Sequence, residues 1–441
     1  MSDSSAPVSM RFTGGLDSLS AADRIALFDR TTSDDSSIRD RTAAVIARVR
    51  SDGDSALRAL ALEYDGVTLD TLEVPRWRWM AALDGLSPAL RRAMERSTEN
   101  IRTVHQAFLP VQQETESEPG IIIGRRPDPL GRVGVYAPGG RAAYPSSVLM
   151  GVVPARVAKV GEIVVCSPPI RDTGRPADVV LAAAALANAD RVFALGGAGA
   201  VAALAYGTAS VPRVDRIIGP GNAYVAEAKL QVSSAVAIDS PAGPSELLVL
   251  ADASADARTI AREMLAQAEH DPLAAVVAVT VGSSLANDVL EALAGLLPLQ
   301  PRSPIVMASL AGQGAVLSAT SIADAIAFAN TYAAEHLLLI VSDADAALAR
   351  LRNTGTVFVG SCASVSFGDY MTGANHVLPT GGLARSYSGL STLDFVRWTT
   401  YQHITPDAAA RLADDVGVFA DAEHLDGHAM AARAFREAVR A

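Results

Sequence analysis

The amino-acid sequence predicts an α/β protein of two or more domains, with parallel sheets covered by helices. Its 441 residues exceed the roughly 250 to 300 residues at which a single core stops growing. Apolar residues make up 49% of the chain and charged residues 19%, a composition typical of a compact globular protein. From residue 121 onward, short β-branched runs alternate with helical patterns, and this order predicts parallel strands joined by right-handed crossovers.

The periodicity places the individual elements. In the first 110 residues the pattern is helical, over 23–30, 38–66 and 87–109. The expected strands after that are 121–126, 132–138, 162–169, 191–197, 215–222, 235–239, 245–252 and 274–282. The expected helices between them are 146–161, 176–190, 222–234 and 259–272. The last fifty residues, from Leu390, are expected to be helical and polar.

Charge and cysteine content exclude several classes of protein. Lys and Arg number 37 against 48 Asp and Glu, a net charge of −11, and no dense basic tract occurs, so nucleic acid and anionic membrane are poor partners. Two cysteines, Cys166 and Cys362, cannot form a disulfide framework, which favours a reducing cytosol. The N-terminus lacks a signal-peptide pattern and no apolar run reaches roughly 18 residues, so a soluble cytoplasmic protein is expected.

Several of the 7 histidines stand beside acids or amides. In AQAEHDP, helical spacing puts Gln267 and His270 on one face, whereas Glu269 points elsewhere. Further clusters are Glu335 with His336, Asp369 with His376, and Glu423 with His424 and His428. Imidazole and carboxylate groups are common zinc ligands, but the spacing does not force these clusters together, and His270 could simply complement a helix dipole.

Glycine-rich loops follow three of the predicted strands. Gly197, Gly199 and Ala202 form GxGxxA, the dinucleotide fingerprint, although no strand ending in an acid follows at the usual distance and close helix packing explains the motif equally well. GPGN at 219–222 and YAPGGRAAYPSS at 136–147 also join a strand to a helix. Free N–H groups at such helix starts suit a cofactor phosphate, but plain tight turns are the alternative.

Taken in order, eight motifs resemble those of histidinol dehydrogenases. They are RVGVYAPGGRAAYPSSVLM, CSPP, VDRIIGPGNAYVAEAK, IDSPAGPSELLVLAD, AQAEHDPLA, EHLLL, GDYMTGANHVLPTGG and EHLDGH, and the resemblance runs from about Gly53 to the end. It implies an NAD-linked enzyme with one zinc ion per subunit that oxidises L-histidinol twice, through the aldehyde, to L-histidine.

The resemblance also assigns site residues. The implied zinc ligands are Gln267, His270, Asp369 and His428. The implied catalytic residues are His336, as a neutral base for the alcohol step, and Glu335, which would activate water for the aldehyde step. The substrate would also contact Ser245, His376 and Glu423, and NAD would lie against Tyr136, Gly199 and Asn222.

Fold and assembly follow by the same resemblance. It implies two incomplete Rossmann-like domains with parallel sheets, plus small helical N-terminal and C-terminal pieces. The expected boundaries are 1–30 for the N-terminal segment, 31–135 with 247–389 for the zinc and catalytic domain, 136–246 for the NAD domain, and 390–441 for the tail. A homodimer with exchanged segments is expected, in which the tail completes the partner's site.

Two residues depart from the family pattern. Gly199 stands where a glutamine is usual, so one hydrogen bond to the cofactor is expected to be missing, at a cost of about 0.5 to 1.5 kcal/mol. Ala334 replaces a proline before the Glu–His pair and is expected to loosen that segment. Two other readings remain open: a related zinc and NAD dehydrogenase of another small polar alcohol, such as sulfopropanediol, and a catalytically silent protein that binds nucleotide or zinc.

Overall fold

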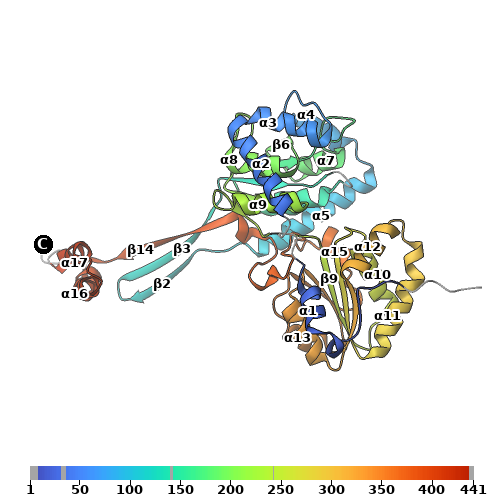
Figure 1. The fold of residues 1–441 in the computed structure, drawn as a ribbon. Helices are drawn as coiled ribbons and strands as arrows, with labels where there is room; N and C mark the ends of the chain where they lie inside the picture. The colour runs from blue at the N-terminus through green and yellow to red at the C-terminus, as the bar shows by residue number, and fades with distance from the viewer. Residues whose placement is uncertain (1–7, 31–35, 140–142, 242, 437–441) are drawn as a thin grey trace, which may run out of the picture.

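The structure, a computed structural model, consists of two α/β bodies and a long arm (Figure 1). It describes residues 8–30, 36–139, 143–241 and 243–436. The arm extends away from both bodies and carries the C-terminal helices at its far end. Among the described helices, none is both long and apolar enough to cross a bilayer.

The first body is built on a six-stranded parallel sheet. Its strands, in sheet order, are β1 (Phe12–Gly15), β11 (Gly314–Ala319), β10 (Ala275–Val281), β9 (Glu246–Ala251), β12 (His336–Ile340) and β13 (Thr356–Val359). Strand β9 is buried on both faces, because alternate side chains enter opposite cores. Leu247 and Val249 pack in one core, whereas Leu248 and Leu250 pack in the other.

Helices cover both faces of this sheet. One face packs against α10 (Ala257–Ala268), α11 (Ser283–Leu296) and α12 (Ser303–Gln313), with η3 (Leu297–Leu299) and α15 (Val365–Tyr370) nearby. The other face packs against η1 (Leu16–Ser18), α1 (Ala21–Phe28), α13 (Ile322–Tyr332) and α14 (Ala344–Leu348). Residues 8–30 of the expected separate segment 1–30 are thus part of this body, because β1 pairs with β11 and Leu27 enters its core.

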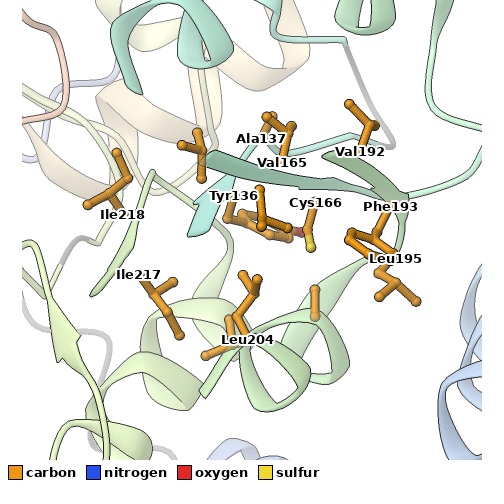
Figure 2. Packing of buried hydrophobic residues seen from close by; sticks show 14 of the residues in the cluster. Tyr136, Ala137, Val165, Cys166, Val192, Phe193, Leu195, Leu204, Ile217 and Ile218 are labelled. Carbon is orange, nitrogen blue, oxygen red and sulfur yellow. The ribbon is translucent and has the colours of Figure 1, made fainter. Parts of the chain in front are cut away.

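The second body is built on a five-stranded parallel sheet. Its strands, in sheet order, are β6 (Arg191–Ala194), β5 (Glu162–Ser167), β4 (Arg132–Tyr136), β7 (Arg216–Ile218) and β8 (Ala237–Ile238). The connecting helices are α6 (Pro145–Val157), α7 (Asp178–Leu186), α8 (Gly197–Tyr206) and α9 (Ala223–Val232). Figure 2 shows Tyr136 beside Cys166 at the strand ends, on the side of the sheet where Leu204 of α8 packs.

The N-terminal helices pack on this second sheet. They are α2 (Ser36–Asp52), α3 (Asp54–Leu60), the π-helical turn η2 (Ala61–Asp65), α4 (Arg76–Asp84) and α5 (Pro88–Ala107). Val49, Leu57 and Trp79 share one core with Val133 and Phe193. The sequence-based division placed 31–135 with 247–389 instead. Amphipathic periodicity shows that a helix has an apolar face but does not indicate which sheet that face covers.

The arm is an antiparallel three-stranded sheet. It consists of β2 (Gln113–Glu118), β3 (Ile121–Pro129) and β14 (Val396–Ile404), and it ends in α16 (Pro406–Ala422), α17 (Asp426–Arg433) and η6 (Ala434–Arg436). The short helices η4 (Leu383–Arg385) and η5 (Thr392–Phe395) precede β14. Two expectations were wrong here: 121–126 pairs antiparallel instead of joining a parallel sheet, and the segment after Leu390 contains a strand.

A buried ion pair ties the N-terminal segment to the first sheet. The guanidinium of Arg30 binds the carboxylate of Glu246 at the start of β9, and both side chains are almost fully buried. Arg30 also donates to the Tyr332 carbonyl oxygen and lies 3.7 Å above the Tyr332 ring centroid. Burial raises the pKa of Glu246 to about 7 even though Arg30 opposes that shift.

Replacing Arg30 with methionine is expected to destabilise the protein strongly, because it leaves Glu246 buried without a counter-charge. The expected loss in the free energy of unfolding is about 3 to 5 kcal/mol, measured by denaturant titration. R156M is the matched control, because the Arg156–Asp190 pair is partly exposed and such pairs contribute about 0 to 1 kcal/mol. Equal losses in the two variants would contradict this role for Arg30.

His105 is a buried histidine without polar partners. It lies near the end of α5, is 1% exposed, and neither ring nitrogen has a hydrogen-bond partner among the described residues. Its ring meets Phe108 edge-on at 5.8 Å between centroids. Burial lowers the pKa of His105 to about 4, so the neutral ring is the form that the fold accommodates at neutral pH.

Acidification is therefore expected to destabilise the protein through His105. Because the pKa of His105 is lower in the folded protein, its contribution to the free energy of unfolding is fully present above about pH 6.5 and is lost as the pH falls towards 4. The loss amounts to about 3 kcal/mol at most. The H105L variant should lack this part of the pH dependence in denaturant titrations, whereas H403L, at an exposed site, should retain it. Parallel pH curves for wild type and H105L would refute the prediction.

Candidate functional site

Glu335 and His336 lie at the junction between the end of α13 and the start of β12. The helix ends with Ala333 in the left-handed conformation, with φ of 55°, and β12 begins at His336. The backbone between them pairs with the neighbouring segment, because Gly355 N donates to Ala334 O and Thr356 N donates to Glu335 O, each at 3.0 Å. The segment is thus hydrogen-bonded in place through carbonyl oxygens that a proline at position 334 would also offer, so the loosening expected from Ala334 stays a prediction.

Two hydrogen-bond donors and the His336 ring converge on the Glu335 carboxylate. Ser245 Oγ donates to Oε2 at 2.6 Å, Glu246 N donates at 2.7 Å, and His336 Nδ1 lies 3.3 Å away. Burial is the largest influence on the pKa of Glu335 and raises it, but the His336 cation and these hydrogen bonds together hold that pKa below its usual value. Glu335 is therefore ionised although it is only 6% exposed.

The contacts of His336 determine which ring nitrogen is available for chemistry. Nδ1 donates to the carbonyl oxygen of Glu246 at 3.0 Å. In the neutral ring, Nε2 is then the proton acceptor. Nε2 is buried, has no hydrogen-bond partner among the residues described, and lies 3.8 Å from Asp369 Oδ1. When the ring is neutral, its basic nitrogen Nε2 therefore faces Asp369.

The charge state of His336 differs from the sequence-based expectation. That expectation took a neutral imidazole with a pKa near 6.5. Burial acts most strongly on the pKa of His336 and lowers it, but the carboxylates of Glu335 and Asp369 outweigh burial and raise it to about 9. Without any bound cation, Glu335 and His336 therefore form an ion pair at neutral pH.

Gln267 joins the same cluster from α10. Its side chain is 3% exposed, and its Nε2 donates to Ser245 Oγ at 2.5 Å. The helix ends at Ala268, earlier than the expected 272, so His270 lies beyond it and is exposed. The His270 N–H still donates to the Gln267 carbonyl at 3.3 Å, which keeps the two residues adjacent.

Asp369 and His376 complete the part of the site that one chain supplies. Asp369 lies in α15, and His376 Nδ1 donates to its carbonyl oxygen at 3.0 Å. Burial lowers the pKa of His376, and the His336 cation lowers it further. The neighbouring Tyr370 interacts electrostatically with Glu269 after α10 and with Tyr144 of the second body. Asn100 of α5 donates to the Met371 carbonyl oxygen at 2.7 Å, and Asn375 donates to the Met150 carbonyl oxygen of α6 at 2.8 Å, so the segment between Asp369 and His376 contacts the second body.

Glu423 and His428 do not lie with these residues. Glu423 caps α16 and His428 lies in α17, both exposed at the far end of the arm (Figure 1). Their own chain thus holds them away from His336 and Asp369. A site containing all eight of the expected substrate-binding residues needs α16 and α17 from elsewhere.

The residues present suit zinc, but one chain offers an incomplete set. Gln267 uses its amide nitrogen to bind Ser245, so its amide oxygen is the atom that can bind a cation. With the His270 imidazole and the Asp369 carboxylate, this makes three donors of the types that zinc accepts. Within the described part of the chain, no group of three His, Cys, Asp or Glu residues is arranged to hold a metal. His428, the fourth ligand that the resemblance implies, lies in α17 at the far end of the arm.

A cavity of about 900 Å³ opens at the carboxyl ends of β4, β5, β6 and β7. In the strand order β6-β5-β4-β7-β8, β5 and β6 follow β4 on one side of it, whereas β7 and β8 lie on the other side. The strand order thus reverses between β4 and β7, and such a reversal is the usual place for a nucleotide in a parallel sheet. The lining of the cavity includes all three residues expected to contact NAD, namely Tyr136, Gly199 and Asn222. The expected loop 136–147 extends over residues 140–142, which lie outside the described residues.

Hydrogen bonds arrange the cavity loops. Tyr136 is 3% exposed, and its hydroxyl accepts from Gly197 N at 3.1 Å at the start of α8. Asn222 caps α9, accepting from Tyr224 N at 3.1 Å through its side-chain oxygen, so its amide nitrogen is the group left to donate. Gly219 has φ of 110°, and a Cβ there would lie 2.1 Å from Tyr136 O. Only glycine fits that turn.

Gly199 is a packing position as well as a cavity residue. A Cβ at Gly199 would lie 3.1 Å from Leu60 Cδ1 and 3.7 Å from Leu57 Cδ2. Helix α3 therefore approaches α8 closely here. The sequence predicted only that Gly199 lacks the hydrogen bond that a glutamine would make to the cofactor. The structure adds a steric effect, because a longer side chain at this position would have to displace Leu60.

Sequence reasoning missed two residues that support the site. Glu246 contacts both members of the Glu335–His336 pair through its backbone, and its carboxylate accepts from Glu335 N at 3.3 Å. Arg30 neutralises that carboxylate. A charged residue at the start of the otherwise apolar strand ELLVLA was the available signal for Glu246. No local pattern distinguished Arg30.

Comparison with known proteins agrees with this geometry. The family model described as histidinol dehydrogenase matches residues 28–436. The histidinol dehydrogenase of Methanosarcina mazei is 45% identical over 90% of this chain and 92% of its own length, and that of Natronomonas pharaonis is 47% identical over 93% and 96%. The crystal structure of histidinol dehydrogenase from Elizabethkingia anophelis superposes with a TM-score of 0.92 at 30% identity, covering 98% of this chain and 99% of that one. Because sequence and fold match over nearly the whole length, the chain belongs to the histidinol dehydrogenase family.

Proposed function

We propose that this protein oxidises L-histidinol to L-histidine in two NAD-linked steps. The observation that carries the proposal is the buried cluster of Ser245, Glu335, His336 and Asp369, which faces the body with the dinucleotide-type cavity. Family membership supports the choice of substrate over another small alcohol. The substrate's imidazole and amine are ordinary ligands of zinc, which suits the donors Gln267, His270 and Asp369.

In the first step the alcohol loses a hydride to NAD and a proton to the protein. His336 Nε2 is the proposed acceptor, because Nδ1 is engaged by the Glu246 carbonyl and Nε2 is free. Glu335 stabilises the imidazolium that forms, through its carboxylate 3.3 Å from Nδ1. The ring must be neutral before it accepts the proton. A cation bound at Asp369 would favour that neutral ring, since it offsets a carboxylate that raises the pKa of His336.

In the second step water adds to the aldehyde carbon, and the hydrate then gives a second hydride to NAD. Glu335 is the proposed base for that water, because hydrogen bonds and the His336 charge keep it ionised despite burial. Ser245 fixes the carboxylate from one side and receives the Gln267 amide on the other. Zinc, when bound, would hold the substrate and fix its carbinol carbon before the nicotinamide.

We also propose a homodimer in which each tail completes the partner's site. Glu423 and His428 lie at the end of the arm, far from their own chain's cluster. Val418, Phe419 and Met430 on the same helices are 66%, 71% and 72% exposed in the single chain. Apolar side chains this exposed favour burial against another surface.

The proposed location is the cytoplasm. Cys166 is buried in the core of the five-stranded sheet and Cys362 is exposed, and neither forms a disulfide. Free thiols are compatible with the reducing cytosol.

The reaction is tested by stoichiometry. The purified protein should form two NADH for each L-histidinol consumed, should lose this activity on chelation, and should regain it with zinc. Sulfopropanediol should give no comparable turnover. If NADH forms only with sulfopropanediol, the substrate is that related alcohol and not histidinol. If no NADH forms with either alcohol, the protein is a catalytically silent binding protein.

The shared site is tested by mixing two inactive variants. E335Q removes the base from one body and H428N removes the tail ligand, so each homodimer should be inactive. Random mixed dimers would contain one intact site, and about a quarter of wild-type activity should return. As a control, mixing E335Q with the E335Q/H428N double variant should restore nothing. Inactive mixed dimers of the two single variants would refute the exchange of tails.

A further inference from the structure

Asp65 is the one carboxylic acid among the described residues that line the cofactor cavity. It ends the π-helical turn η2, and Gly66 follows in the left-handed conformation with φ of 68°. The cavity also receives Arg41 and Arg171 from neighbouring segments. Asp65 lies close enough to Tyr136 for its charge to raise the pKa of that phenol.

No hydrogen bond or ion pair among the described residues stabilises a negative charge on Asp65. Asp65 stands at the C-terminal end of a helical turn, where the helix dipole disfavours an anion. It is half-buried, and burial raises its pKa to about 6. In the described part of the chain it has neither a hydrogen-bond donor nor an ion-pair partner. An acid kept under such conditions in a cavity is a candidate ligand-binding group.

Other acids near this sheet are already engaged elsewhere. Asp215 precedes β7 and accepts from Arg132 N at 2.8 Å, so it lies at the amino edge of the sheet, away from the cavity. Asp239 follows β8, but it is paired with the buried Lys229 and accepts from Gly219 N at 2.8 Å. The acid that usually follows a glycine fingerprint is therefore missing from its expected place. Asp65 reaches the cavity from a segment more than a hundred residues earlier.

We propose that Asp65 binds the 2′-hydroxyl of the adenosine ribose of NAD and thereby selects NAD over NADP. This inference rests on the proposed use of NAD. A carboxylate accepts a hydrogen bond from a ribose hydroxyl and repels a 2′-phosphate. The adenosine half belongs here because the cavity and Asp65 are in the second body, while His336 and Glu335, which the nicotinamide must reach, are in the first. Arg41 and Arg171 supply positive charge suited to the diphosphate.

The test compares binding of three nucleotides to the zinc-loaded enzyme by calorimetry, without substrate. The nucleotides are NAD, NADP and the NAD analogue that lacks the adenosine 2′-hydroxyl. Wild type should bind NAD about tenfold more tightly than the deoxy analogue, and D65N should reduce this ratio to a few-fold, because the amide oxygen still accepts from the 2′-hydroxyl but the acceptor is no longer charged. D65N should also reduce the preference for NAD over NADP and raise KM for NAD with little change in kcat.

D70N is the matched control, since it removes the same charge five residues away at an exposed position outside the cavity lining. D65S tests the same hydroxyl contact with a smaller side chain if D65N unfolds. Equal weakening of NAD and its deoxy analogue in the Asp65 variants, or no weakening at all, would overturn the inference. Failure of wild type to bind NAD would instead overturn the proposed function, which separates the two outcomes.

Discussion

Glu246 holds the catalytic pair in place, and the arrangement of the site depends on it. Its backbone N–H and carbonyl bind Glu335 and His336, respectively, and its side chain accepts from the Glu335 N–H. All of these groups are buried, so each would be costly without its partner. Arg30 provides the charge that lets this carboxylate remain in the core. The N-terminal segment thus contributes to the site without touching the reacting atoms.

The same contacts explain how a buried pair can serve two different steps. The Glu246 carbonyl fixes the Nδ1–H tautomer of His336 and leaves Nε2 free. The Ser245 hydroxyl and the Glu246 N–H keep Glu335 ionised. In the proposed reaction, one group is therefore oriented to take a proton from the alcohol, and the other remains charged for the hydration that follows. The opposite pKa shifts of Glu335 and His336 are a property of the pair and not of either residue alone.

In the proposed function, the division into two bodies separates cofactor binding from substrate chemistry. The cavity belongs to the five-stranded sheet and the helices packed on it, whereas the catalytic cluster belongs to the six-stranded sheet. Tyr144 and Tyr370 lie near each other where the bodies face. The arm adds a third component, because it carries Glu423 and His428 away from their own cluster. In the proposed dimer, this construction would bring the partner's tail to the proposed zinc site.

The sequence by itself determined the fold class, the parallel strands and most helices, because hydrophobic periodicity is a local property that each segment carries. Its ordered motifs also indicated the family, which the comparisons confirmed. Periodicity did not reveal that α2–α5 cover the second sheet, or that 121–126 and the segment after Leu390 pair as an arm. Those outcomes depend on which apolar faces meet and which strand edges pair, and these are properties of distant segments.

The site shows the same limit. Motifs identified Ser245, Glu335 and His336 as candidates, and the structure brings these three together. Only the tertiary structure decided that Arg30, Glu246 and Asp65 stand beside the site and the cavity, because burial and counter-charges arise from segments far apart in the chain. It likewise decided the charge of His336, since a pKa depends on the surrounding field and not on the residue type.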